Sequence, residues 1–230
     1  MTSSHEEPRL PLALQAYRMI HEKIITMDYE PGQHLEEKHL VNELGIGRTP
    51  VREALLRLTS EFLVESQPNR GFIVKPLTLQ NIKAMFEALR IIEIGAASLA
   101  VHQDPARHLS SMREAQENFE AAMQANDLLR LVWTNHEFHM HFARCSSNEY
   151  LVRALQDVRN EVNRLAYLSF GGKEELAGDL LQHYRTVCRE HEQIMNSLEH
   201  KDLGTLKKTI EAHIRSFQHR VVLYLTTSGV

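Results

Sequence analysis

From residue 78 to about residue 225 the sequence carries an almost unbroken series of helical patterns, and this feature constrains the fold most. Apolar residues recur there at intervals of three and four, the repeat of a helix with one buried face. Polar or Gly/Pro breaks divide the region at Asp104-Pro105, Asn126-Asp127, Ser146 to Asn148, Gly171-Gly172 and Asp202. The predicted helices span 78–103, 105–125, 127–145, 148–168, 175–199 and 202–225. Six long helices can bury a core of their own, so we expect an all-helical bundle.

The first 76 residues follow a different pattern, in which short helices precede a strand-forming run. Helical spacing predicts helices at 12–27, 36–44 and 48–59, with breaks at Glu30-Pro31-Gly32 and Gly45. A turn at 67–71 comes before the β-rich run Phe72-Ile73-Val74. Helix, turn, helix and hairpin, in this order, are the layout of a winged helix-turn-helix.

The boundary between the two regions is expected at Lys75-Pro76-Leu77-Thr78. Pro76 ends the strand, and the Thr78 hydroxyl can cap the next helix. The predicted fold is therefore mainly α. It comprises a flexible tail at 1–10, a winged helix-turn-helix at 11–76, a helical domain of six or seven helices at 77–225 and a short tail at 226–230.

The apolar runs and the cysteine content of the sequence indicate where in the cell the protein is found. No apolar run approaches the roughly 18–20 residues that span a bilayer, and residues 1–9 lack the apolar core of a signal peptide. The two cysteines, Cys145 and Cys188, are too few for a disulfide framework. These features predict a cytoplasmic protein with reduced thiols and no membrane partner.

Net charge does not by itself indicate a nucleic-acid partner. The formal charge of the whole chain is −4, and residues 1–76 hold nine Lys/Arg against eleven Asp/Glu. Basic residues nevertheless gather in residues 47–76, where Arg48, Arg52, Arg57, Arg70 and Lys75 face three glutamates. Phosphate binding depends on local charge at the contact surface, so the case for DNA must come from the motif.

Three segments together carry a family resemblance: Pro31 to Leu35, Leu44 to Leu55, and Asn69 to Val74. This string, with Leu40 and Leu58 between its parts, closely resembles the GntR family of bacterial regulators. The helical remainder resembles the effector domain of the FadR subfamily, called the FCD domain. The count of six long helices favours the VanR-like branch of that subfamily. The resemblance implies a transcriptional regulator that binds double-stranded operator DNA.

The helix predicted at 48–59 is the candidate recognition helix, which enters the major groove by its N-terminal end. Arg48 lies in its first turn, and Arg52 lies one turn further on the same face. A guanidinium fork can pair with two acceptors on guanine, which discriminates between bases by about 1–3 kcal/mol. Thr49 and nearby backbone amides suit phosphate. The alternative is an exposed amphipathic helix whose arginines are only solvated.

Other candidate DNA contacts lie outside that helix. Asn69-Arg70-Gly71 would form the tip of the wing, where Arg70 or the Gly71 backbone can approach the minor groove. The resemblance also implies a DNA contact from Lys38 on the preceding helix. One departure is Gly47, where the family usually has Ser or Thr; glycine can cap a helix but offers no hydroxyl.

Four polar residues interrupt apolar stripes on three helices of the bundle. Asn135 and His139 share the inward face of the 127–145 helix, His191 lies in the stripe of the 175–199 helix, and His213 lies in that of the last helix. Buried imidazoles need partners. Three of them with one oxygen suit a divalent transition metal of the Zn, Ni or Mn type.

The resemblance sharpens this metal hypothesis. Many FCD domains bind a metal through an Asp-x3-His pair and one histidine from each of two later helices. His139, His191 and His213 occupy the histidine positions, and Asn135 stands where the aspartate is expected. An amide oxygen is a poorer ligand than a carboxylate. The alternatives are weaker metal binding, a water-mediated contact at Asn135, histidines that bind an anionic effector directly, and histidines that are satisfied core residues.

Arg90 is the candidate effector-binding residue. Glu87 to Glu93 resembles the Arg-x-x-Glu segment of the first FCD helix, and an inward arginine would bind a carboxylate in a bidentate pair. The alternative is a surface ion pair between Arg90 and Glu93 at i,i+3 spacing.

These features predict a metabolite-responsive regulator, not an enzyme. It would bind a near-palindromic operator as a homodimer, and a small carboxylic acid would relieve repression. A metal sensor without an organic effector is one alternative. A metal-dependent hydrolase is another. However, its candidate base Glu192 adjoins His191 and points about 100° away from it, and the other candidate, Glu137, lies two residues from His139 and points about 200° away.

Overall fold

The structure is a computed structural model that describes residues 10–68, 70–171 and 177–227. The expected tail at 1–10 and Asn69 of the wing tip therefore lie wholly or almost wholly outside the described residues, as do residues 228–230. The chain divides into two compact units between Leu77 and Thr78. Within the described residues there are nine helices and three strands, so the expected mainly α fold is confirmed.

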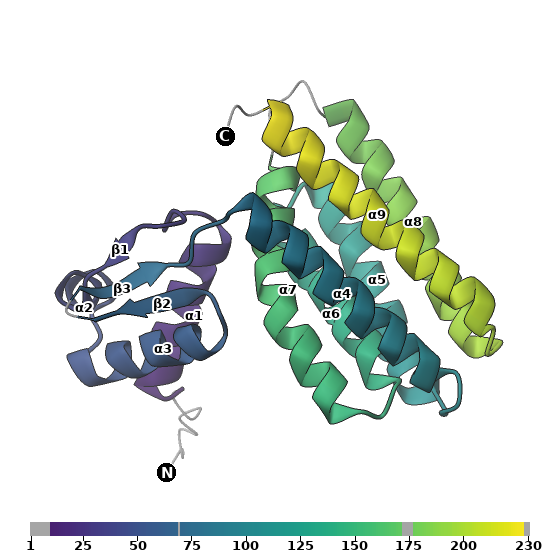
Figure 1. Ribbon diagram of the computed structural model, residues 1–230, viewed down its shortest axis with the longest axis horizontal. Helices are drawn as coiled ribbons and strands as arrows, with labels where there is room; N and C mark the ends of the chain where they lie inside the picture. Colours follow the sequence, from purple (N-terminus) through teal and green to yellow (C-terminus); the bar gives the residue numbers. More distant parts are fainter. Residues whose placement is uncertain (1–9, 69, 172–176, 228–230) are drawn as a thin grey trace, which may run out of the picture. The chain divides into compact units, whose positions relative to one another are not determined.

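The first unit is a winged helix-turn-helix (Figure 1). It contains α1 (Leu12–Ile25), β1 (His34–Leu35), α2 (Glu37–Leu44), α3 (Arg48–Ser60), β2 (Val64–Gln67) and β3 (Gly71–Val74). The strands form an antiparallel sheet in the order β1-β3-β2, with Leu35 opposite Phe72 and Val64 opposite Val74. The sequence predicted a hairpin here but marked only β3 as a strand.

The core of this unit forms where α1 packs against α3. Ile20 and Ile24 of α1 are fully buried, as are Leu55 and Leu58 of α3. They recur at intervals of three and four and so share one face of each helix. Because α3 turns this face inward, its other face is left for solvent.

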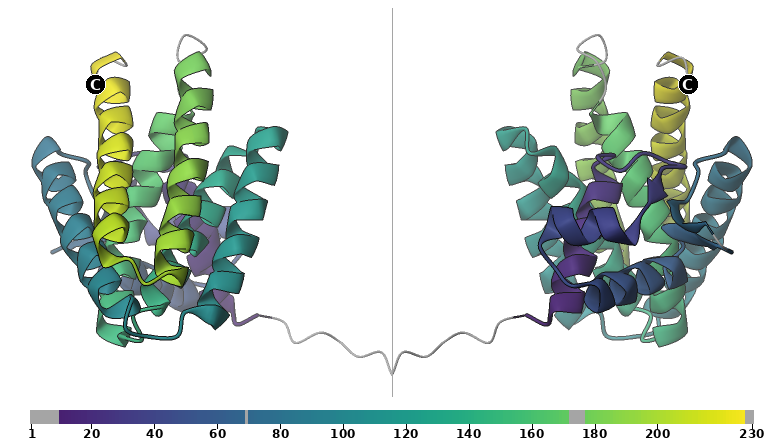
Figure 2. Two further views of the ribbon diagram at one scale, coloured as in Figure 1. Left: turned by 90° about the vertical axis from the view of Figure 1, so that its right-hand side faces the viewer. Right: turned by 90° about the vertical axis from the view of Figure 1, so that its left-hand side faces the viewer.

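The second unit is a ring of six helices (Figures 1 and 2). They are α4 (Leu79–Ala100), α5 (Ala106–Ala125), α6 (Leu128–Arg144), α7 (Glu149–Phe170), α8 (Ala177–Glu199) and α9 (Leu203–Thr227). Packing contacts run from α4 through α7, α6, α5, α8 and α9 back to α4. The ring thus closes, and its inward faces surround a common interior.

Local chemistry explains where these helices begin. The Thr78 hydroxyl accepts a hydrogen bond from the Asn81 amide at 3.1 Å, and the Asp127 carboxylate accepts one from the Arg130 amide at 3.0 Å. The Asn148 side chain caps α7 in the same way. These caps satisfy backbone N–H groups that a helix start leaves free. Each observed end lies within three residues of the predicted one, and α9 extends to Thr227, into the expected tail.

Candidate functional site

The recognition helix α3 leaves two arginines on its solvent side. It follows Gly45, whose left-handed backbone (φ +64°) ends α2, and Gly47, which caps α3 without a side-chain hydrogen bond. The Arg48 side chain is 75% exposed and that of Arg52 is 58% exposed. Both guanidinium groups therefore lie on the protein surface, where a DNA groove could reach them.

A single carboxylate on α2 holds both arginines. Arg48 Nε donates to Glu37 Oε2 at 2.8 Å, and Arg52 Nη1 donates to Glu37 Oε1 at 3.1 Å. The Glu37 side chain is only 14% exposed, so this carboxylate is less mobile than its two partners. Sequence patterns alone do not reveal the role of Glu37, because the pairing depends on how α2 and α3 meet.

The other predicted DNA contacts are also on the surface. Lys38 in the first turn of α2, Thr49 in α3 and Arg70 beside the wing are all exposed. Gly71, which starts β3, has φ of +82°, a backbone conformation that side-chain-bearing residues rarely adopt. That these residues touch DNA stays a prediction.

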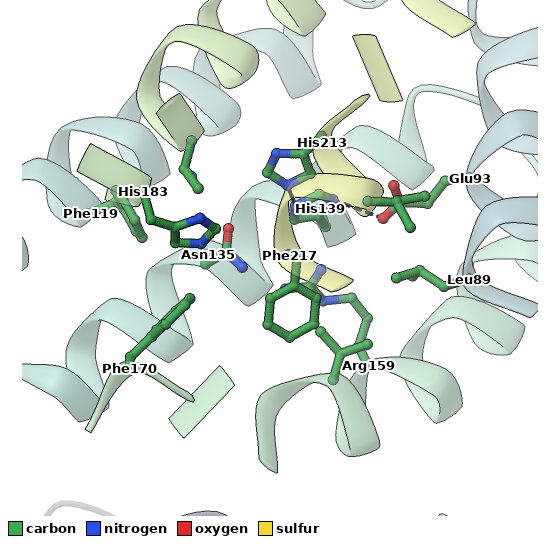
Figure 3. Close-up of a pocket in the computed structure, with 13 residues that line it drawn as sticks. Leu89, Glu93, Phe119, Asn135, His139, Arg159, Phe170, His183, His213 and Phe217 are labelled. Atoms are coloured by element: carbon green, nitrogen blue, oxygen red, sulfur yellow. Dashed lines mark hydrogen bonds and ion pairs between the residues drawn. The ribbon is translucent and has the colours of Figure 1, made fainter. Parts of the chain in front are cut away.

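Three histidines from different helices meet inside the ring. His139 of α6, His191 of α8 and His213 of α9 are buried, and one ring nitrogen of each lies within 4.8 Å of the others. The Nε2 atoms of His139 and His213 are 3.1 Å apart. The convergence that the apolar stripes suggested is therefore present, and Figure 3 shows two of its members, His139 and His213.

The far side of each imidazole ring faces an oxygen atom. His139 Nδ1 lies 2.8 Å from Glu93 Oε1. His213 Nδ1 lies 2.8 Å from Glu190 Oε2, and His191 Nδ1 lies 2.7 Å from Gln116 Oε1. The contacts of His191 and His213 have hydrogen-bond geometry, and their oxygen acceptors favour the tautomer with hydrogen on Nδ1. In these two rings the lone pair is then on Nε2, which faces the other histidines, as in protein metal sites. His139 Nδ1 and Glu93 Oε1 are close but are not aligned for a hydrogen bond.

Burial strongly influences the charges at this centre. Desolvation lowers the pKa values of His139 and His191 well below the ordinary value, and the positive charge of Arg159 acts in the same direction on both. Burial also raises the pKa of the Glu93 carboxyl, although Arg159 opposes that shift. Neutral imidazoles are the form that coordinates metal ions.

The donor atoms fit a divalent transition metal. His191 Nε2 and Asn135 Oδ1 are buried, and neither has a hydrogen-bond partner among the described residues. Buried polar atoms without partners are uncommon in proteins. Together with the Nε2 atoms of His139 and His213, these atoms make a candidate donor set of three imidazoles and one neutral oxygen. That this set holds a metal stays a prediction.

A cavity adjoins the histidine centre (Figure 3). Its walls are largely apolar and include Leu89, Phe119, Val162, Phe170 and Phe217. Glu93, Asn135, Arg159 and His183 contribute polar groups. The volume of the cavity is about 20 Å³. That is room for an ion or a water molecule, so an organic acid would have to widen it.

Arg90 does not point into this cavity, contrary to expectation. Its side chain is 55% exposed on α4, where Nη1 lies 3.9 Å from Glu211 Oε1 of α9. The alternative expectation, a surface pair of Arg90 with Glu93, is also wrong, because Glu93 is buried beside His139. Arg90 follows the inward-facing Leu89 by one residue, and this step turns a helical side chain by about 100°.

Sequence reasoning missed several polar residues of the cavity. Arg159 interrupts the buried α7 stripe of Leu155, Val162 and Ala166 at helical spacing, so the signal that revealed the histidines was present here too. Glu93 interrupts the inward face of α4 in the same way. The acceptor Gln116 gave a weaker signal, since its role depends on His191, 75 residues away.

Together, the two units define a class of protein in which a winged helix-turn-helix domain is joined to a helical domain with a small internal cavity. Comparisons with known proteins agree. The profile of bacterial regulatory proteins of the gntR family matches residues 12–74, and the FCD domain profile matches residues 84–216.

Individual relatives are distant but span most of the chain. The HTH-type transcriptional regulator YdhC of Bacillus subtilis (strain 168) is 24% identical over 207 residues, covering 88% of each chain. The HTH-type transcriptional repressor RspR of Escherichia coli (strain K12) is 21% identical over 214 residues, covering 93% of this chain and 90% of RspR. The solved structure of E. coli McbR/YncC has a similar fold, with a TM-score of 0.76 at 20% identity, covering 96% of this chain and all of that one.

The chain belongs to the GntR family of bacterial transcriptional regulators and carries an FCD domain, as in the FadR subfamily. It is a DNA-binding regulator, and the relatives named above are regulators rather than enzymes. No helix within the described residues combines the length and apolar character needed to cross a bilayer.

Proposed function

We propose that the protein is a metabolite-responsive repressor that binds a near-palindromic operator as a homodimer. In this proposal its FCD domain holds a divalent transition metal beside a small carboxylic acid effector. The observation that carries the proposal is the meeting of His139, His191 and His213 at a buried centre, with an oxygen atom within 2.8 Å of the Nδ1 atom of each ring. The name of the relative RspR supports the choice of repressor.

Nitrogen atoms at the histidine centre supply the physical argument for a cation. The Nε2 atoms of His139 and His213 lie within hydrogen-bond distance of each other at 3.1 Å, and His191 Nε2 is buried without a partner among the described residues. A cation coordinated by the three Nε2 lone pairs would replace the His139–His213 hydrogen bond and would engage His191 as well. When bound, the metal would also supply a positive charge that attracts an acid. His139, His191 and His213 would hold it, with the amide oxygen of Asn135 as a weaker fourth ligand.

The position of α4 suggests how an acid would act on DNA binding. Leu89 and Glu93 of α4 line the cavity. Only four residues separate the end of β3 in the winged unit from the start of α4. An acid that widens the cavity must move some of the surrounding helices. An effector controls DNA binding only if it binds the free and DNA-bound arrangements with different affinities.

Metal content is the first test. Protein purified without an affinity tag should contain close to one transition-metal ion per chain by mass spectrometry. Asn135→Asp should bind Zn²⁺ more tightly, because a carboxylate is a better ligand than an amide. A tenfold gain would add about 1.4 kcal/mol to the unfolding free energy at saturating metal, measurable by thermal denaturation.

The matched control for the metal site is His141→Asn, a change on the same helix but outside the histidine centre. It should leave the metal content unchanged, whereas His139→Asn should abolish it. A wild-type protein without stoichiometric metal, and unable to take it up on dialysis, would remove the metal from the proposal. So would an Asn135→Asp protein whose thermal stability does not respond to Zn²⁺.

The DNA-binding part is tested separately. Fluorescence anisotropy with DNA from upstream of the protein's own gene should show salt-dependent binding, and light scattering should show a dimer. Arg48→Ala should weaken binding by about 1–3 kcal/mol if the contact is to a base. Unchanged affinity in Arg48→Ala would exclude that contact, and a monomer on DNA would exclude the palindromic mode.

The small cavity also favours a second candidate, a metal sensor without an organic effector. About 20 Å³ admits an ion but no acid unless the helices move. In that case Zn²⁺ alone would change operator affinity, and adding carboxylic acids to the metal-loaded protein would change nothing further. A response to acid at constant metal supports the first candidate.

A further inference from the structure

A second buried group in the FCD domain has no protein partner. Arg159 of α7 is 2% exposed, and its guanidinium lines the cavity beside the histidine centre (Figure 3). Neither its Nε nor its Nη2 atom has a hydrogen-bond partner among the described residues. A buried charged group with unpaired donors is costly unless a ligand engages it.

The nearby carboxylate does not satisfy Arg159. Glu93 attracts the guanidinium electrostatically, but its Oε1 atom lies 2.8 Å from His139 Nδ1, and no hydrogen bond joins the two side chains. Burial lowers the pKa of Arg159 to about 10, which leaves it charged at neutral pH. The cavity wall therefore carries the positive charge of Arg159, and the Nε and Nη2 donors of this guanidinium have no acceptor among the described residues.

We propose that Arg159 is the anchor for the effector's carboxylate, and that the effector is a small monocarboxylic acid with an apolar body. This inference rests on the proposed function and names the ligand class of the same site. Nε and Nη2 form one edge of the guanidinium, and that edge pairs with both oxygens of a carboxylate in parallel hydrogen bonds.

The number of cationic side chains in the cavity favours one carboxylate over two. Arg159 is the only arginine or lysine among the described cavity-lining residues. A second carboxylate, or a phosphate dianion, would find no second arginine or lysine on this wall. The aromatic rings of Phe119, Phe170 and Phe217 supply an apolar wall for the rest of the ligand.

A buried histidine nitrogen without a hydrogen-bond partner further narrows the class of effector. His183 Nε2 is buried in the cavity wall without a hydrogen-bond partner among the described residues, while Nδ1 of the same ring lies 3.5 Å from Ser216 Oγ. Figure 3 shows Arg159 and His183 on different sides of the cavity. The effector therefore carries an uncharged hydroxyl or carbonyl oxygen away from its carboxylate, within reach of His183.

The test is calorimetric titration of the full-length protein with acids and their primary amides. The probes are acetate, lactate, 4-hydroxybutyrate, phenylacetate and 4-hydroxybenzoate, with succinate and inorganic phosphate for comparison. Hydroxylated monocarboxylates should bind best, and their amides should not compete. Arg159→Gln should weaken acid binding by about 10- to 100-fold, the worth of hydrogen bonds to a charged group, while metal content and operator binding are retained.

Three variants give the controls. Arg90→Gln removes an exposed arginine of α4 and should leave acid binding unchanged. Arg159→Met should raise the melting temperature of the acid-free protein, because it removes an unsatisfied buried charge. Arg164→Met should lower it, since Arg164 on the same helix pairs with Glu161 at 3.2 Å. An Arg159 with only a structural role would give a lower melting temperature in both methionine variants.

The outcomes separate this inference from the function on which it rests. Acid binding that survives Arg159→Gln, or that Arg90→Gln removes equally, would overturn the role of Arg159. Preference for succinate, phosphate or amides, or no binding of any acid to the wild type, would overturn the ligand class. Metal binding and operator binding are measured independently and decide the proposed function by themselves.

Discussion

Glu37→Gln tests whether Glu37 positions the side chains of Arg48 and Arg52 before the protein binds DNA. The Glu37 carboxylate accepts hydrogen bonds from Arg48 at 2.8 Å and from Arg52 at 3.1 Å. A free arginine side chain carries about 2 kcal/mol of rotamer entropy, part of which must be lost on binding a base. Because Glu37 already restricts both side chains, it lowers this cost in the complex.

The size of the effect follows from these contacts. Exposed ion pairs are worth about 0.2–1 kcal/mol each, and both arginines are more than half exposed. Loss of both should weaken binding to the specific operator by about 0.5–2 kcal/mol, or roughly 2- to 30-fold. Binding to random DNA should instead become tighter, because a negative charge near the phosphates has been removed.

The assay is fluorescence anisotropy on operator and random duplexes over a range of salt concentrations. Glu36→Gln is the matched control, since Glu36 is exposed, adjacent and without an ion pair among the described residues. Glu36→Gln should tighten binding to both duplexes alike, whereas Glu37→Gln should move them in opposite directions. If Glu37→Gln also tightened both equally, Glu37 would only repel DNA and the positioning argument would be refuted.

Two further predictions concern the metal centre and the core. Gln116→Ala removes the oxygen that orients His191 at 2.7 Å and should reduce metal affinity by about 10- to 100-fold, measured by competition with a chelating dye; an unchanged affinity would show that the hydrogen bond does not position the ligand. Leu55→Ala should cost about 2–5 kcal/mol in chemical denaturation, since Leu55 is fully buried between α1 and α3. Its neighbour Leu56 is 51% exposed, and Leu56→Ala should stay within about 0.5 kcal/mol, so equal losses would contradict the assigned core face.

Sequence periodicity located the helices well because the chain marks their ends chemically. Thr78, Asp127 and Asn148 each cap a helix through a side-chain oxygen, and such residues are recognisable without a structure. The strands were harder to predict. β1 has two residues, and β2 reads Val-Glu-Ser-Gln with only Val64 buried, so neither offers an alternating pattern to recognise.

Periodicity also explains the success with the histidines and the error with Arg90. A polar residue in an apolar stripe must face the interior, and this rule located His139, His191 and His213. Arg90 was chosen from a family resemblance, although Leu89 already occupied the inward position. The same rule applied to α7 would have selected Arg159. Contacts such as Arg48 with Glu37 depend on how two helices meet, which single-helix patterns do not contain.

Several polar groups with unsatisfied atoms border one small cavity of the FCD domain. Asn135 Oδ1, His183 Nε2 and the Nε and Nη2 atoms of Arg159 have no hydrogen-bond partner among the described residues. A sequence selected only for stability would replace such groups with apolar side chains of similar volume. Their presence together is explained if a cation and an anion fill the cavity in the working protein. Because Glu93 and Leu89 of α4 form part of that wall, a ligand bound there would act on the helix that follows the winged domain in the chain.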